Sequence, residues 1–186
     1  MLKPKILDKK TLWEGQFLRV VGIEFHNGHG KTFLWEAIER RNVDGIVAVV
    51  PVTSDNNIIV LKQFRPPLGR YVIEFPAGLN DRGEPVEEVA RRELLEETGY
   101  VAEKLDFLID APLSSGASTE KMDVFVATGC RKTAEQDLEE VELIEVIEIP
   151  MRDFYKTFLS LRASDIILDP KVPGLIEIAR IKGFIK

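Results

Sequence analysis

"AGLNDRGEPVEEVARRELLEETGY", residues 77–100, predicts one helix with clear ends, and its acidic end governs the interpretation of the chain. Pro85 suits a first helical position and Gly99 suits a C-terminal cap, which predicts a helix over residues 85–98. At about 100° per residue, one face of this helix covers an arc of about 100°. That face carries Val86, Ala90, Glu93, Leu94 and Glu97, with Glu96 about 60° to the side. The stripe begins apolar and ends in carboxylates, so the glutamates point inward where core residues would continue.

The glutamates stand at the helix end that disfavours negative charge. Each faces the negative end of the helix dipole, at about 0.3–1 kcal/mol, and like charges three or four residues apart repel one another. Arg92 offsets only part of this, because it pairs with Glu88 or Glu96 and lies about 100° from Glu93. A bound cation is the missing partner. Carboxylates without Cys or His nearby favour Mg²⁺, Mn²⁺ or Ca²⁺ over Zn²⁺, and Mg²⁺ with substrate phosphates is the usual arrangement for phosphoryl chemistry.

Composition limits the class of protein. The 186 residues are 45% hydrophobic, enough for one well-cored domain. A net charge of −6 argues against general binding to nucleic acid or anionic membranes. The single cysteine, Cys130, excludes an intrachain disulfide framework and is interpreted as a buried small residue. No apolar signal or transmembrane segment is evident, so we expect a cytoplasmic protein.

The remaining pattern predicts a strand-rich fold. Two strand-like runs joined by "HNGHG" predict an N-terminal hairpin, and two more split by "TSDN" predict a buried second hairpin. A turn and a short strand are expected within "PPLGRYVIEFPAG", further strands over residues 122–129 and 141–149, and helices around 151–161 and 172–182, with the run at 102–113 left unassigned. Single helices among strands indicate a mixed α/β (α+β) sandwich. A boundary is expected near "RRNVDG", which divides an N-terminal β unit, residues 1–42, from a main domain, residues 43–186.

The quoted stretch resembles the Nudix box, G-x5-E-x7-R-E-U-x-E-E-x-G-U, in which U is apolar. The match has no gap, and Tyr100 is its loosest position. Outside the box, "GQFLRV", "GKTFLWEAIERR", "VLKQFRPPLGRYVIEFPAG" and "ELIEVIEIP" resemble the ADP-sugar pyrophosphatases. The resemblance implies an α/β/α sandwich with a mixed sheet and an N-terminal β unit that joins two subunits. It also implies metal-dependent attack of water on the pyrophosphate of ADP-ribose or a related nucleoside diphosphate sugar.

By their position in the box, the metal ligands would be Glu93, Glu97, Glu96 and the carbonyl of Ala77, with Mg²⁺ as the ion and Mn²⁺ as a substitute. Side chains four residues apart lie side by side on a helix, which agrees with this set. Arg92 would orient the glutamates. Glu84 precedes Pro85 and is interpreted as a cap or loop-organising residue.

Two glutamates remain alternatives for the group that activates water. The animal ADP-sugar enzymes point to Glu142, which falls in the acidic strand expected over residues 141–149. Bacterial ADP-ribose pyrophosphatases point to Glu120, in the exposed-looking loop "SSGASTEK", residues 114–121. The spacing does not choose between them.

The likeness also implies a set of substrate contacts. Trp35 and Phe17 would sandwich a base from two subunits, because aromatic faces accept any base. Arg40 and Arg65 would contact phosphate. The other expected contacts are Glu36, Ala77 and Leu79.

One departure from the family pattern bears on specificity. The loop that usually reads S-P-G reads Ser114-Ser115-Gly116 here, so a range of nucleoside diphosphate sugars is credible beside ADP-ribose. A housecleaning nucleoside triphosphatase and a non-catalytic nucleotide-binding module are the alternative functions. We expect a homodimer, because the N-terminal hairpin is too small to bury its own apolar faces.

Overall fold

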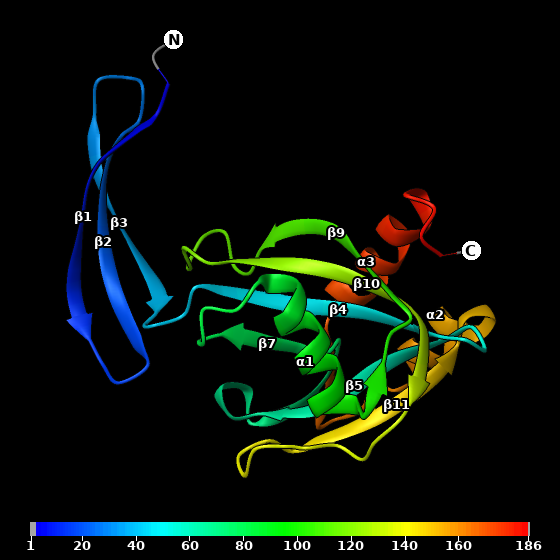
Figure 1. The fold of residues 1–186 in the computed structure, drawn as a ribbon. Helices are drawn as coiled ribbons and strands as arrows, with labels where there is room; N and C mark the ends of the chain where they lie inside the picture. The colour runs from blue at the N-terminus through cyan, green and yellow to red at the C-terminus, as the bar shows by residue number, and fades with distance from the viewer. Residues whose placement is uncertain (1–2, 186) are drawn as a thin grey trace.

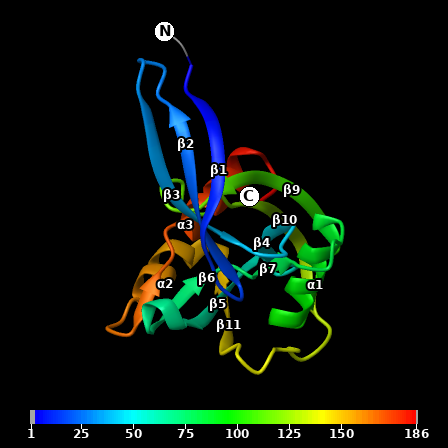
Figure 2. The ribbon, with the colours of Figure 1, turned by 90° about the vertical axis from the view of Figure 1, so that its left-hand side faces the viewer.

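The computed structural model describes residues 3–185 and contains two sheets (Figure 1). The termini of the two expected units, residues 1–2 and 186, lie outside this range. Strands β1 (Lys5–Glu14), β2 (Leu18–His26) and β3 (Thr32–Arg40) form an antiparallel three-stranded sheet. It projects from the main body like an arm (Figures 1 and 2). The expected N-terminal hairpin is therefore β2–β3, whereas β1 was not expected, because its lysines hide the strand pattern.

The main sheet is mixed. Its strands follow the order β12-β6-β5-β4-β10-β8, with β7, β9 and β11 paired beside this path. Its longer strands are β4 (Gly45–Thr53), β5 (Asn57–Arg65), β9 (Lys104–Pro112), β10 (Lys121–Lys132) and β11 (Ile144–Pro150). Its shorter strands are β6 (Arg70–Glu74), β7 (Ala77–Asn80), β8 (Tyr100–Val101) and β12 (Ile166–Leu168). β4 runs parallel to β10, and β12 runs parallel to β6, while the other pairs are antiparallel.

The hairpin expected between β4 and β5 is only partly present. The two strands share a single paired position, Val52 with Ile58, and then diverge. β4 turns to pair with β7 and β10, while β5 pairs with β6 and β11. This divergence could not be predicted from the sequence, because the apolar pattern of a strand does not indicate which strands pair with it. Short strands β7, β8 and β12 were also not expected.

Helices cover both faces of the sheet. The alternating side chains of β4 show this: Ile46, Ala48 and Val50 join a core with α2 (Phe154–Ser160) and α3 (Lys171–Ile181). Val47 and Val49 join a second core with α1 (Val86–Thr98). Two short 3₁₀ turns are also present: Pro66–Leu68 precedes β6, and Met151–Asp153 precedes α2. This confirms the expected sandwich of mixed sheet and helices, with Cys130 buried beside α1. Within residues 3–185, every helix is too short or too polar to cross a bilayer.

Candidate active site

The last two turns of α1 press their carboxylates against the start of β7. The helix begins one residue later than expected, with Pro85 at the N-cap, and ends at Gly99 in the left-handed conformation. The Ala77 N–H donates to Glu97 Oε2 at 2.9 Å. The Glu93 carboxyl lies directly on Gly78, where an added Cβ would come within 1.9 Å of Glu93 Cδ. A glycine is therefore required at position 78 for this close approach.

These two carboxylates are buried, as their helix face predicts. Glu97 is 2% exposed and Glu93 is 8% exposed. Burial raises the pKa of Glu97 to about 9, although the Ala77 N–H favours the ionised form. Burial also raises the pKa of Glu93, with Arg92 opposing the shift. The charge of Glu142 adds to both increases. In the metal-free protein both carboxyls therefore resist ionisation, because the protein alone does not compensate a negative charge at this site.

Arg92 is the hub of this cluster. Its Nη1 donates to Glu93 Oε1 at 2.7 Å and to Glu96 Oε2 at 2.9 Å, and its Nε donates to Glu84 Oε2 at 3.2 Å. Burial alone would lower the pKa of Arg92, but the carboxylates outweigh it and raise the pKa. The expectation that Arg92 cannot reach Glu93 was wrong, because the long guanidinium arm crosses to the neighbouring row of the helix.

Glu84 organises the loop before α1. Its backbone N–H donates to Asn80 Oδ1 at 3.0 Å, and Asn80 Nδ2 donates to the Glu84 carbonyl. Its carboxylate pairs with Arg92. No side chain caps α1, so the alternative of a capping role was wrong, whereas the loop-organising role agrees with these contacts.

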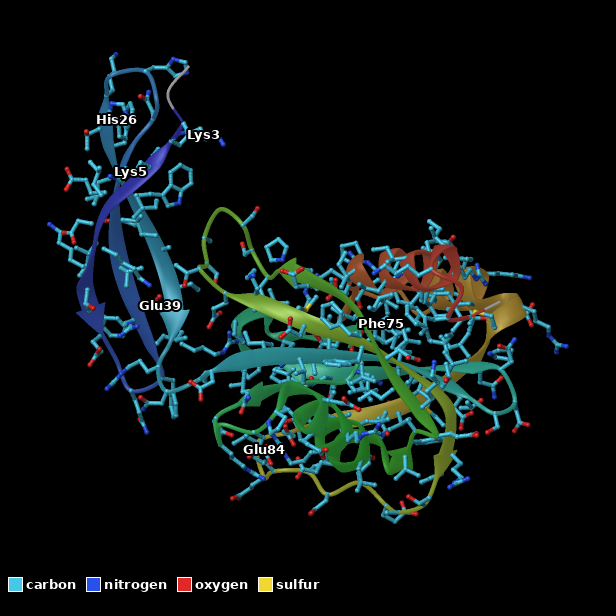
Figure 3. All side chains as sticks on the ribbon, turned by 45° about the horizontal axis from the view of Figure 1, so that its top comes forward. Lys3, Lys5, His26, Glu39, Phe75 and Glu84 are labelled. Atoms are coloured by element: carbon cyan, nitrogen blue, oxygen red, sulfur yellow. The ribbon has the colours of Figure 1, made fainter. Side chains whose placement is uncertain are left out.

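The donor set at α1 fits a hard divalent cation. The buried donors are carboxylate oxygens, and Glu97 has one hydrogen-bond donor within the described chain, the Ala77 N–H. His26 lies near the far end of the N-terminal sheet, away from α1 (Figure 3). Within residues 3–185, however, no three Asp, Glu, His or Cys side chains are gathered closely enough to hold a metal ion. Glu96 is engaged by Arg92 instead, so the ligand trio expected from the box stays a prediction.

Glu120, one candidate base, is held by the N-terminal sheet. Its carboxylate accepts from the Arg40 backbone N–H at 2.9 Å and from Arg40 Nη1 at 2.6 Å. Only 14% of its side chain is exposed, so the expectation of an exposed position was wrong. The Trp35 indole N–H donates to the Gly116 carbonyl at 3.0 Å, and Ile38 exchanges backbone hydrogen bonds with the same loop. The loop is therefore fastened along β3.

Glu142, the other candidate, precedes β11. The strand begins at Ile144, so the expectation that Glu142 lies in a strand was wrong. Its Oε2 accepts from the Glu139 N–H at 2.9 Å. Its influence on the pKa values of Glu93 and Glu97 places its charge within electrostatic range of the cluster.

The comparisons with known proteins agree with this geometry. The NUDIX domain model matches residues 44–167. The chain belongs to the Nudix family. The ADP-ribose pyrophosphatase of Bacillus subtilis (strain 168) is 34% identical over 182 residues, covering 97% of this chain and 95% of that protein. The ADP-sugar pyrophosphatase of Mus musculus is 32% identical, covering 91% and 84%. In fold, the chain is similar to a crystal structure of an ADP compounds hydrolase, with a TM-score of 0.75, 24% identity and 98% of each chain covered.

The expected substrate contacts of this Nudix protein fall in two groups. Ala77, Leu79 and Arg65 lie with the α1 cluster: the Leu79 carbonyl accepts from Arg92, and the Arg65 charge lowers the pKa of Glu97. The second group belongs to the N-terminal unit: Trp35, Glu36 and Arg40 lie on β3, and Phe17 lies in the turn before β2. Phe17 is 72% exposed and Trp35 is 51% exposed, so neither is a core residue.

Three further residues of the Nudix chain were missed from the sequence. Asn80 braces the Glu84 loop, Glu74 holds Arg65, and Glu39 joins Lys9, Arg19 and Thr119. Burial would raise the pKa of Glu39, but these partners outweigh it and lower the pKa. Figure 3 shows Glu39 at the end of the N-terminal sheet near the main body. Acidic residues on otherwise apolar strands, as in "YVIEF", were the available signal.

Proposed function

We propose that this Nudix enzyme uses Mg²⁺ to hydrolyse the pyrophosphate bond of ADP-ribose or a related nucleoside diphosphate sugar. The products are a nucleoside monophosphate and a sugar phosphate. The observation that carries the proposal is the buried pair Glu93 and Glu97, pressed against Ala77 and Gly78 in a site where the protein alone does not compensate ionised carboxylates. The similarity to an ADP-ribose pyrophosphatase along nearly the whole chain supports the substrate class.

The ligands of the cation are proposed to be Glu93, Glu97, the Ala77 carbonyl, and Glu96 once it leaves Arg92. When bound, Mg²⁺ supplies charge neutralisation at the pyrophosphate and lowers the pKa of water; Mn²⁺ is the proposed substitute. The residues of the chain do the positioning. Arg92 orients Glu93 and, before the cation binds, Glu96, a role supported by its hydrogen bond to Glu93 and its ion pair with Glu96.

The substrate is proposed to lie between the two groups of contacts. Arg65 and Arg40 would hold phosphate oxygens through their planar guanidinium groups. Trp35 and Phe17, whose rings are largely exposed, would stack on the base. Glu36, Ala77 and Leu79 complete the proposed contacts. The base that accepts the proton from water is proposed to be Glu120 or Glu142. Glu120 would have to leave Arg40 first, whereas Glu142 already acts electrostatically on Glu93 and Glu97.

A homodimer is proposed to form through the N-terminal unit, residues 1–42. Large apolar side chains in this unit are exposed, among them Trp13 at 59%, Phe17 at 72%, Leu34 at 55% and Ile6 at 61%. So much exposed apolar surface on a three-stranded unit is unusual for a monomer. Light scattering at micromolar concentration should give twice the chain mass, and a monomeric mass would contradict this. The main domain, residues 43–186, would then carry the catalytic cluster, and the cytoplasmic location stays a prediction.

A substrate panel tests the function. Purified protein with Mg²⁺ is incubated with ADP-ribose, other sugar nucleotides and deoxynucleoside triphosphates in ¹⁸O-water, and the products are identified by mass spectrometry. Preferred turnover of a sugar nucleotide is expected, and the label reports which phosphorus is attacked. The loop at Ser114-Ser115-Gly116 makes turnover of several sugars the expected result.

Two other results would replace the proposal. Preferred turnover of deoxynucleoside triphosphates would indicate a housecleaning hydrolase. Binding of nucleotide without turnover of any diphosphate would indicate a non-catalytic module. A Glu97→Gln variant, folded and inactive, serves as the negative control for contaminating activity.

A further inference from the structure

Glu74 is a largely buried carboxylate outside the box that pairs with one side chain, Arg65. It ends β6, three residues before Ala77, and only 14% of its side chain is exposed. Its Oε1 accepts a hydrogen bond from Arg65 Nε at 2.6 Å. Within residues 3–185, Arg65 is its only side-chain hydrogen-bond donor. Lys171, the other cation nearby, pairs with Asp169 at 2.6 Å.

The register of the sheet explains the pairing. β5 and β6 are antiparallel, with Leu61 opposite Glu74 and Arg65 opposite Arg70. Residues two apart on a strand share a face, so Arg65 and Glu74 project on the same side of the sheet, displaced along it. Arg65 must extend back along the strand to meet Glu74. That fixes the direction of its whole side chain.

The atom used in the contact matters. Glu74 takes the Nε of Arg65, and no hydrogen bond joins the terminal nitrogens of Arg65 to any residue in the range 3–185. The guanidinium charge nevertheless acts on Glu97, whose pKa it lowers. Arg65 therefore presents two terminal nitrogens, with four unused N–H donors, within electrostatic range of the carboxylate cluster. A planar fork held by its Nε edge suits a bidentate contact with phosphate oxygens.

We propose that Glu74 is a positioning residue that holds Arg65 in the orientation needed to grip a diphosphate. This rests on the proposed function, because it names the support for the proposed phosphate contact of Arg65. Glu74 itself does not touch the substrate. Its burial and the charge-assisted bond to Arg65 remove the rotational freedom that a long, partly exposed arginine would otherwise have to lose on binding.

The test is a double-mutant cycle on kcat/KM for the sugar nucleotide that the wild type hydrolyses best. Arg65→Ala should lower kcat/KM by about 100-fold, and Glu74→Leu by about 10- to 30-fold. Glu74→Gln keeps an acceptor for Nε without charge and should lose only about 3-fold. In the Arg65→Ala background, Glu74→Leu should have less than about a 2-fold further effect, because there is no arginine left to position.

The kinetic pattern separates positioning from damage to the fold. The loss should appear mainly as a higher KM, because a phosphate contact present in both bound substrate and transition state acts on binding. A structural defect would lower the active fraction and reduce apparent kcat at unchanged KM. Glu145→Gln is the matched control. This variant removes the ion pair between Glu145 on β11 and Lys62 on β5, the strand that also carries Arg65. It should leave KM unchanged.

Binding of the non-hydrolysable diphosphate α,β-methylene-ADP, measured by calorimetry with Mg²⁺ present, repeats the cycle without turnover. Equal affinity in wild type and Glu74→Leu, or additive losses in the double variant, would overturn the proposal for Glu74. If the wild type hydrolyses no sugar nucleotide, the proposed function fails, and this binding cycle alone still decides the role of Glu74.

Discussion

Replacing Glu97 with Gln should stabilise the metal-free protein at alkaline pH. Burial raises the pKa of Glu97 to about 9, and a single backbone N–H, that of Ala77, is its hydrogen-bond donor within the described chain. Gln has nearly the same shape, retains an oxygen that accepts from Ala77, and carries no charge. The Glu97→Gln variant therefore resembles the protonated wild type at every pH.

The sign and size of this stability difference follow from the pKa of Glu97 in the folded protein and in the unfolded chain. A carboxyl with a pKa of about 9 in the folded protein and 4.5 in the unfolded chain takes up a proton on folding between these values. Its favourable contribution is complete below pH 4.5 and is lost as the pH rises through 9. At about 1.4 kcal/mol per pH unit, wild type should lose at most about 4 kcal/mol relative to the variant between about pH 5.5 and about pH 8.5.

Urea unfolding in EDTA at several pH values, followed by tryptophan fluorescence, measures this difference. Protein concentration is held constant, because association would change the apparent stability. Glu87→Gln, on the exposed side of the same helix, is the control and should keep the wild-type dependence on pH. The reasoning is refuted if Glu97→Gln also keeps the wild-type slope and is no more stable than wild type at about pH 8.5.

Three further outcomes follow from the same geometry. Mg²⁺ at about 100 times its dissociation constant should add about 2.7 kcal/mol of stability, a rise in melting temperature of about 5–10 °C by scanning calorimetry, and less in Glu97→Gln. Gly78→Ala should push the Glu93 carboxyl aside and lower kcat/KM by about 100-fold or more, with little change in stability. The control is Gly174→Ala, whose added Cβ meets nothing within 4 Å and which should leave kcat/KM unchanged. Equal kcat/KM values for the two variants would contradict the contact between Gly78 and Glu93. Because its partners lower the pKa of Glu39, wild type should lose stability as the pH falls below 4.5 more steeply than Glu39→Gln, and parallel acid unfolding curves would exclude this.

Local sequence patterns predicted correctly those features that depend on a single secondary-structure element. The helix ends at Pro85 and Gly99, and the inward turn of Glu93 and Glu97, were readable because helical period and caps are properties of consecutive residues. The environment of Glu120 was misjudged for the opposite reason. The loop before β10 is largely exposed, as its polar residues predict, but Glu120 is mostly buried because it bonds to β3, about eighty positions away in the chain.

The family of this protein could be predicted from one continuous stretch of sequence, because the box from Gly78 to Tyr100 places carboxylates at helical spacing and identifies the Nudix family. Its partners could not be read in that way. Arg92 reaching Glu93, Arg65 held by Glu74, and Glu120 held by Arg40 depend on side-chain reach and on strand register. Spacing along one helix is local, whereas the choice of partner belongs to packing between distant segments, which only the folded chain brings together.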